Sequence, residues 1–278
     1  MQYISTRGGE ERVSSAQAIK QGIAADGGLF VPETLPEFTG QELRSMMDMT
    51  YPQRAAAILG KFLCDYTEQE LTAYCEKAYS DKRFTSAKSP APVVQLNDQI
   101  SVLELYHGPT SAFKDMALQL MPSLLAGALE KTGEKRDAFI LTATSGDTGK
   151  AALEGYCDAD RVKIMVFYPV DGVSRVQKLQ MSTQTGNNVN ICPVRGNFDD
   201  AQTGVKRIFS DPEAASYLND HGYFFSSANS INWGRLAPQI VYYVSAYWDM
   251  VKSGTVSFGE TIDVSVPTGN FGDIFAAY

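Results

Sequence analysis

The chain has 278 residues, of which 44% are hydrophobic and 20% charged, and its formal net charge is −8 at pH 7. This composition is typical of a globular protein with a sizeable core, and the length suits one large α/β domain or two ordinary ones. Phosphate backbones are bound by clustered lysine and arginine, and the sequence has no basic run. We therefore expect no nucleic-acid partner.

Membrane insertion and secretion are also unexpected. The longest nearly apolar stretch, residues 116–129, is interrupted by Gln119 and Pro122 and is too short to cross a bilayer. The first 15 residues have no apolar core and do not resemble a secretory signal. These features predict a cytoplasmic protein with no membrane partner.

A metal site is not expected from the cysteines or histidines. None of the four cysteines forms a C-x-x-C pair, and their spacing fits no zinc pattern; they are Cys64, Cys75, Cys157 and Cys192. Only two histidines are present, His107 and His221. We interpret the cysteines as reduced, partly buried hydrophobic residues and expect no metal.

Residues 1–88 are predicted to form a mainly helical N-terminal domain. Residues 41–59 and 68–79 carry apolar side chains at helical spacing, and Thr67 followed by Glu70 predicts a capping box before the second helix. The boundary is expected at residues 89–92, where two prolines favour extended chain.

Residues 89–278 are predicted to form an α/β region, with about 138–228 as a smaller subdomain. Apolar strands are expected at 138–142, 162–168, 189–194, 223–227 and 261–266. Helices are expected to follow them, from about residues 149, 174, 199, 233 and 271. This alternation predicts a parallel sheet with helices on both faces. Ligands of such sheets bind beyond the carboxyl ends of the strands.

The last expected helix is too short to return to the sheet as a crossover connection. We therefore expect that the C-terminal remainder of the α/β fold is missing from this chain. An isolated chain of this length is expected to have little or no activity.

Two turns between strands and helices carry glycines. The turn at 269–273 has two glycines before a helix, which predicts a phosphate cradle of backbone N–H groups. The turn at 144–149 fails the spacing of a P-loop, because two residues separate its glycines and Ala151 follows Lys150. A nucleotide-binding P-loop protein is therefore disfavoured. The polar residues of this turn could contact a ligand or simply cap the helix.

Lys114 is the candidate for covalent chemistry. It lies between Phe113 and an apolar helix expected from Asp115 to about Lys131, with Pro122 at a kink or near its start. Partial desolvation and the positive end of a helix both disfavour an ammonium group. A neutral amine is what a Schiff-base lysine requires. The alternative is a solvated surface lysine.

Taken together, several segments resemble the threonine synthases with a long N-terminal domain. In chain order they are residues 3–8 and 26–32, 107–115, 142–149, 196–200, 229–233 and 269–273. The resemblance implies a type II pyridoxal-phosphate fold with pyridoxal 5'-phosphate as cofactor. It also implies conversion of O-phosphohomoserine and water to threonine and phosphate.

The resemblance assigns roles to residues at the matching positions. Lys114 would hold the cofactor as a Schiff base, and the other cofactor-binding residues would be Phe113, Asp147, Gly269, Asn270, Phe271, Gly272 and Asp273. The substrate-binding residues would be Ser145, Asp147, Thr148 and Asn232. By chemistry alone, Arg235, Lys150 and Lys178 are candidates for the substrate phosphate. The partner of the pyridine nitrogen would lie beyond Tyr278.

Two alternatives to threonine synthase activity remain open. The first is another pyridoxal-phosphate lyase of the same fold, a dehydratase or a phospholyase that releases 2-oxobutyrate. The second is a non-catalytic fragment that retains only cofactor binding. The products formed from O-phosphohomoserine distinguish the first from a threonine synthase.

Overall fold

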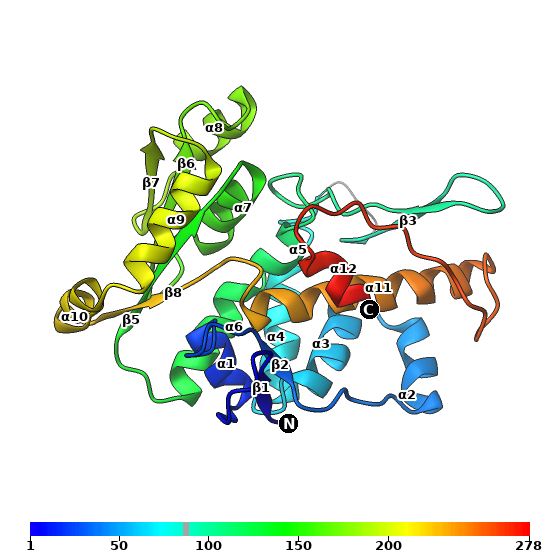
Figure 1. Ribbon diagram of the computed structural model, residues 1–278. Helices are drawn as coiled ribbons and strands as arrows, with labels where there is room; N and C mark the ends of the chain where they lie inside the picture. Colours follow the sequence, from blue (N-terminus) through cyan, green and yellow to red (C-terminus); the bar gives the residue numbers. More distant parts are fainter. Residues whose placement is uncertain (86–88) are drawn as a thin grey trace.

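The computed structural model describes residues 1–85 and 89–278. Its N-terminal part combines a small antiparallel sheet with helices (Figure 1). Strand β1 (Tyr3–Ser5) pairs with β2 (Phe30–Pro32), and α1 (Ser15–Gln21) lies between them in the sequence. The helices α2 (Gly40–Ser45), α3 (Tyr51–Phe62) and α4 (Glu68–Ala78) follow. This part is mainly helical, as predicted, but the β1–β2 pair was not predicted.

Capping residues decide where these helices begin. The single helix expected at 41–59 is interrupted, because α2 is followed by a short 3-10 helix (η1, Met46–Asp48) and α3 starts at Tyr51. Gln53 accepts a hydrogen bond from the Thr50 N–H at 2.9 Å, which stabilises this new start. The predicted Thr67–Glu70 capping box is present at the start of α4.

A four-stranded parallel sheet forms the α/β core of the chain. It has the order β7-β6-β5-β8, formed by β5 (Asp137–Ala143), β6 (Val162–Pro169), β7 (Val189–Val194) and β8 (Tyr223–Ser226). The helices α7 (Asp147–Tyr156) and α9 (Phe198–Phe209) cover it (Figure 1). α8 (Arg175–Ser182) precedes β7, and α10 (Pro212–Asp220) precedes β8.

Alternation along β5 gives the sheet two buried faces. Ala138 and Ile140 belong to the main hydrophobic core, which includes Ala151 of α7. Leu141 and Ala143 point the other way and pack with Val205 of α9 in a second cluster. The predicted architecture, a parallel sheet with helices on both faces, is therefore confirmed for this part of the chain.

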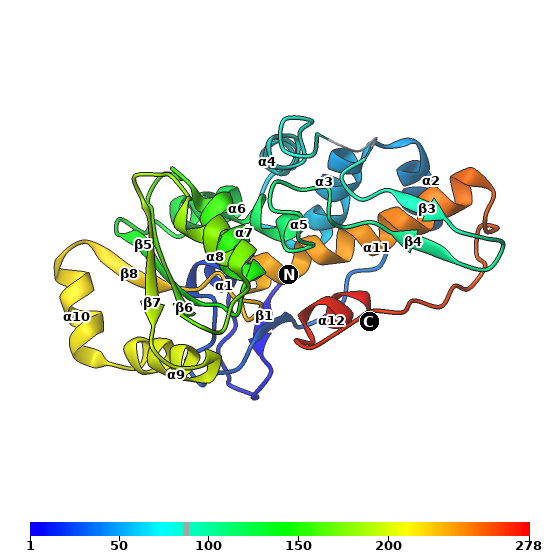
Figure 2. The same cartoon turned by 90° about the horizontal axis from the view of Figure 1, so that it is seen from above.

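Two helices connect the sheet to the N-terminal part. The helix expected from Asp115 to about Lys131 is broken into α5 (Asp115–Leu118) and α6 (Met121–Lys131), with Pro122 in the first turn of α6. The long α11 (Trp233–Ser253) lies beside α3 and α5 (Figure 2). Leu59 of α3, Leu124 of α6 and Val241 of α11 share one hydrophobic core. The division into domains at 88/89 stays a prediction, and residues 86–88 lie outside the described part.

One predicted strand is wrong. Residues 261–266 are extended but pair with no strand in the described parts of the chain, and Val264 is 53% exposed. Strand hydrogen bonds need a neighbouring edge, which local apolar character does not supply. The helix expected near Phe271 is present as α12 (Gly272–Ala277). An unpredicted hairpin, β3 (Val93–Gln95) with β4 (Ser101–Leu103), precedes α5.

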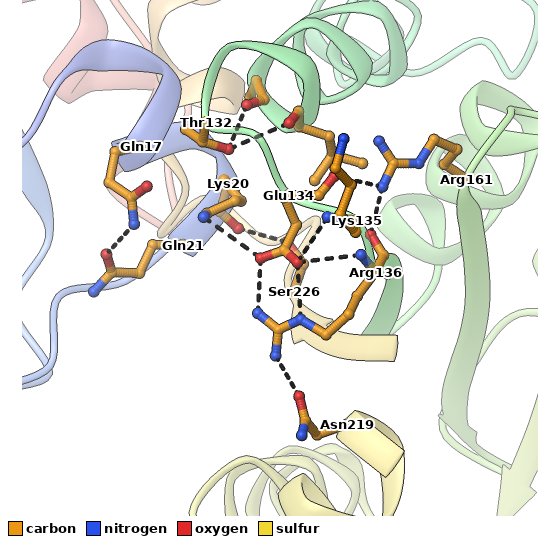
Figure 3. Close-up of polar contacts among 12 residues, drawn as sticks. Gln17, Lys20, Gln21, Thr132, Glu134, Lys135, Arg136, Arg161, Asn219 and Ser226 are labelled. Atoms are coloured by element: carbon orange, nitrogen blue, oxygen red, sulfur yellow. Dashed lines mark hydrogen bonds and ion pairs between the residues drawn. The ribbon is translucent and has the colours of Figure 1, made fainter. Parts of the chain in front are cut away.

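A polar network around Glu134 joins three parts of the fold (Figure 3). The Glu134 carboxylate accepts hydrogen bonds from Arg136 at 2.8 and 2.7 Å and lies 3.6 Å from the amine of Lys20 in α1. Arg136 in turn donates to Asn219 of α10 at 2.9 Å. One nearly buried carboxylate thereby connects α1, the entry to β5 and α10.

Within residues 1–85 and 89–278, no helix has both the length and the apolar character needed to cross a membrane.

Candidate active site

Segments far apart in the sequence meet around one cavity of about 480 Å³. It lies where β5 and β8 end, the position expected for a ligand of a parallel sheet. Most of the predicted site residues line it: Phe113, Lys114, Ser145, Thr148, Gly269, Asn270, Gly272 and Asp273. The glycine turn at 269–273 and the turn at 144–149 therefore face the same space as Lys114.

Lys114 is partly buried at the cavity wall, immediately before α5. Its Nζ lies 2.6 Å from Asp147 Oδ2 and 4.5 Å from the centre of the Phe113 ring. The Lys114 side chain is 14% exposed, whereas that of Asp147 is 45% exposed. An aromatic face and a carboxylate thus hold one amine at the cavity, which is the arrangement needed to present a nucleophile in a fixed direction.

A buried carboxylate next to Lys114 fixes the turn that carries it. Asp115 accepts hydrogen bonds from the Thr110 N–H at 2.8 Å and the Thr110 hydroxyl at 2.7 Å. Burial raises the pKa of Asp115, and the two hydrogen bonds partly oppose this shift. A Cβ on Gly108 would lie only 2.5 Å from the Asp115 Cβ, so this position accepts glycine alone. Sequence reasoning did not assign a role to Asp115.

Thr144 closes the turn that precedes α7. Its hydroxyl oxygen accepts from the Gly146 N–H at 3.0 Å and the Gly149 N–H at 2.9 Å. Gly146 has φ 154°, and a Cβ there would collide with Gln177 at 2.5 Å. Because Thr144 already accepts hydrogen bonds from these two backbone N–H groups, the hydroxyls of Ser145 and Thr148 remain available at the cavity.

Arg235 is a buried cation at the cavity. It lies in the first turn of α11, is 5% exposed and donates a hydrogen bond to the Ala228 carbonyl at 2.7 Å. Burial lowers its pKa to about 10, so it remains charged at neutral pH. No ion pair to Arg235 is found among the residues that the structure describes. A buried guanidinium without an acidic partner is a strong candidate to bind an anionic ligand.

Asp273 connects the glycine turn to α11. Its Oδ1 accepts hydrogen bonds from the hydroxyls of Tyr242 and Tyr243, the second at 2.7 Å. Burial is the main cause of a raised pKa at both tyrosines, which therefore stay protonated donors. The Asp273 carboxylate consequently anchors the turn, and Gly269, Asn270 and Gly272 line the cavity where a ligand could bind.

Three predicted site residues are not among those that line the cavity: Asp147, which nevertheless contacts the Lys114 amine, Asn232 and Phe271. Asn232 is fully buried, and its carboxamide donates to the Ile19 and Ser227 carbonyls and accepts from the Gly234 N–H at 2.9 Å. Its polar atoms cap α11, so they are not free to bind a substrate. Phe271 is 71% exposed and is not among the residues that line the cavity.

Two of the cations suggested by chemistry alone are also elsewhere. Lys150 forms an ion pair with Glu154 at 3.0 Å, and Lys178 lies exposed on α8. Neither lines the cavity. For metals, the described residues contain no group of three or more histidine, cysteine or acidic side chains suited to hold an ion.

Comparison with known proteins tests the resemblance to threonine synthases. Residues 2–79 match the family model described as threonine synthase N terminus. The solved structure of PLP-bound threonine synthase from Brucella melitensis superposes on 100% of this chain and 57% of its own, with 38% identity and a TM-score of 0.88. Over its whole length the chain is similar in sequence and structure to threonine synthases. The predicted resemblance and the predicted α/β fold class are confirmed.

Other relatives give the same picture. The yeast threonine synthase structure covers 100% of this chain with a TM-score of 0.87 and 34% identity. The threonine synthase of Pseudomonas aeruginosa is 42% identical over 280 residues, covering 100% of this chain and 56% of that protein. Human "Threonine synthase-like 1" is also 42% identical, covering 99% of this chain and 39% of that protein. The chain thus spans about half, or less, of the length of these curated relatives.

Proposed function

We propose that this protein acts as a pyridoxal-phosphate-dependent threonine synthase, converting O-phosphohomoserine and water to threonine and phosphate. The observation that carries the proposal is the partly buried Lys114 amine at the wall of a cavity bordered by a glycine turn. The homology to threonine synthases over the whole chain supports it. We also propose a cytoplasmic location.

The donor set of the cavity fits pyridoxal phosphate. Lys114 offers an amine that can bond covalently to the cofactor aldehyde, with the Phe113 ring 4.5 Å away. The turn at 269–272 offers backbone N–H groups, and a Cβ at Gly269 would meet nothing within 4 Å, so the space beside it is open. We assign the cofactor phosphate to this turn, with Asp273 as its anchor to α11.

Lys114 is proposed to move protons during the reaction. When bound, pyridoxal phosphate withdraws electrons and stabilises a carbanion at the substrate α-carbon. The Lys114 amine would take a proton from the α-carbon and return it at neighbouring positions. Asp147, 2.6 Å from Nζ, orients that amine toward one face of the substrate.

The two anionic ends of O-phosphohomoserine need separate partners. The hydroxyls of Ser145 and Thr148, near the start of α7, are suited to a carboxylate. Arg235 is suited to the substrate phosphate, because a guanidinium binds phosphate oxygens with two parallel hydrogen bonds. Burial of Arg235 excludes water, which strengthens such a contact.

Cofactor binding is tested by absorbance. Added pyridoxal phosphate should give a visible band that bleaches with borohydride and is absent in Lys114→Ala. Lys150→Ala is the matched control, because Lys150 lies nearby on α7, is paired with Glu154 and does not line the cavity. A persistent borohydride-sensitive band in Lys114→Ala would move the cofactor to another lysine and refute the assignment.

The reaction is tested by product analysis with O-phosphohomoserine. Threonine together with phosphate supports the proposal. A keto acid without threonine would instead support a phospholyase. Cofactor uptake with neither product would indicate a cofactor-binding protein without this activity.

A further inference from the structure

One face of α9 borders the cavity and has no role in the function proposed above. Phe198, Gln202 and Lys206 follow one another at intervals of four residues and all line the cavity. Residues four apart in a helix lie on the same side, so they form one continuous stripe. Ala201, on the adjoining side, packs against the sheet. The side chains along this stripe therefore line the cavity from α9, whereas Arg235 comes from α11 and Lys114 precedes α5.

The segment at 196–200 fixes the rotation of this helix. Asn197 accepts a hydrogen bond from the Asp200 N–H at 3.0 Å, and Asp200 accepts one from the Asn197 N–H at 2.8 Å. Gly196 has φ 150°, and a Cβ there would lie 2.5 Å from an Asp200 oxygen. This reciprocal cap sets where α9 begins, and hence which residues turn toward the cavity.

The two polar members of the stripe have no protein partner. Within the described residues, neither the carboxamide of Gln202 nor the amine of Lys206 takes part in any of the side-chain hydrogen bonds or ion pairs found elsewhere in the fold. Lys206 is exposed and Gln202 half-buried. By contrast, the Lys114 amine forms an ion pair with Asp147. Lys206 therefore brings to the cavity a positive charge that forms no ion pair among the residues that the structure describes.

Charge balance indicates which kind of ligand Lys206 can bind. A phosphate monoester carries nearly two negative charges at neutral pH, whereas Arg235 supplies one positive charge. The cations among the described lining residues are Lys114, Lys206 and Arg235. With Lys114 paired to Asp147, Lys206 is the remaining cation for the second charge. The protein as a whole has a net charge of −8, so a local cationic pair is needed to attract an anionic substrate.

We propose that Lys206, assisted by Gln202, binds the phosphate of the substrate together with Arg235 and so selects a phosphorylated amino acid over its free alcohol. This inference rests on the proposed function, since it names a contact to the same substrate. Lys206 acts on binding and selectivity and takes no part in proton transfer.

Ligand binding to the cofactor-loaded protein tests this role. Dissociation constants for O-phosphohomoserine and for homoserine are measured by calorimetry, together with the constant for pyridoxal phosphate itself. Lys206→Ala should weaken O-phosphohomoserine binding roughly fivefold, as expected for a charge near the surface. It should leave homoserine and cofactor binding unchanged. Lys206→Arg should restore most of the loss, and raising the salt concentration should weaken binding less in Lys206→Ala than in the unsubstituted protein.

Arg207→Ala is the matched control, because Arg207 is the next residue of α9, is exposed and does not line the cavity. Equal weakening by Arg207→Ala would point to diffuse surface charge and overturn the inference. Unchanged O-phosphohomoserine affinity and salt dependence in Lys206→Ala would also overturn it while leaving the proposed function intact. Cofactor uptake without any O-phosphohomoserine binding in the unsubstituted protein would overturn both.

Discussion

The amine of Lys114 and the carboxylate of Asp147, 2.6 Å apart, join the starts of α5 and α7 beside the cavity that Lys114 lines. Because Asp147 is 45% exposed, water and salt screen this pair. A double-mutant cycle with Lys114→Ala and Asp147→Ala should therefore give a coupling of about 0.5–1 kcal/mol in the free energy of unfolding without cofactor. Saturation with pyridoxal phosphate, which engages the lysine, should reduce that coupling. An unchanged coupling on cofactor addition would argue against the assignment of Lys114.

Two buried arginines should respond differently to the same substitution. Arg54 contacts Asp249 at 2.6 Å and also bonds Ser245, so Arg54→Met leaves a carboxylate without its partner and should destabilise the protein by about 3 kcal/mol. Arg235→Met removes a cation that has no ion-pair partner among the described residues, and it should change the free energy of unfolding by only about 1 kcal/mol. Urea unfolding measures both values.

The same Arg235→Met variant should lose ligand affinity. We expect O-phosphohomoserine binding to weaken more than tenfold, because a buried charge-assisted contact is lost. Calorimetry on the cofactor-loaded protein measures the change, with Arg54→Met examined under conditions where it remains folded. Unaltered affinity in Arg235→Met would exclude this guanidinium as the phosphate partner.

Glu134 should make stability depend on acid pH. Hydrogen bonds from Arg136 are the largest cause of the lowering of the Glu134 pKa from 4.5 to about 2. A lowered folded-state pKa means that this contribution is complete above pH 4.5 and is lost as the pH falls toward 2. Glu134→Gln should cost about 1–2 kcal/mol near neutral pH, and the difference from the unsubstituted protein should shrink in that acid range. A difference that stays constant across the range would contradict this role.

Gly108→Ala should disturb the position of Lys114, the proposed cofactor lysine, although Gly108 itself is not assigned to the cofactor. The new methyl group would overlap Asp115, whose hydrogen bonds to Thr110 hold the turn before Lys114. We expect pyridoxal phosphate affinity to fall more than tenfold in an absorbance titration. Gly204→Ala in α9 is the control, since a Cβ there meets nothing within 4 Å and alanine favours a helix. Equal cofactor affinity in Gly108→Ala and Gly204→Ala would show that the turn before Lys114 does not control cofactor binding.

Local patterns predicted the elements whose signals are local. The four paired parallel strands and their following helices appear where apolar runs and turns indicated them, and the Thr67–Glu70 cap was readable from two residues. The strand predicted at 261–266 is wrong because strand formation depends on the edge of a neighbouring strand, which no local pattern reveals. The continuous helix predicted at 41–59 is wrong because capping at Thr50 starts a new helix despite the continuous apolar spacing.

The site was predictable only where a motif carried it. Lys114 and the two glycine turns stand in recognisable segments, and they meet at one cavity. The exposure of Phe271 and the use of Asn232 as a helix cap depend on packing that the motif does not encode. Arg235 was one of three cations suggested by chemistry alone, and its burial at the cavity singles it out from Lys150 and Lys178. The α9 stripe became a candidate only when its place at the cavity was known.

The length of α11 has a consequence for the size of ligand that the cavity can hold. This single helix of 21 residues carries Arg235 in its first turn and holds the glycine turn through Tyr242. Seven residues separate these positions, which corresponds to about 10 Å of helical rise. The proposed substrate-phosphate site at Arg235 and the proposed cofactor-phosphate site at the glycine turn are therefore held apart by one rigid helix. A substrate has to reach from Arg235 to the cofactor, so this helix limits the length of chain between the phosphate and the amine of the substrate.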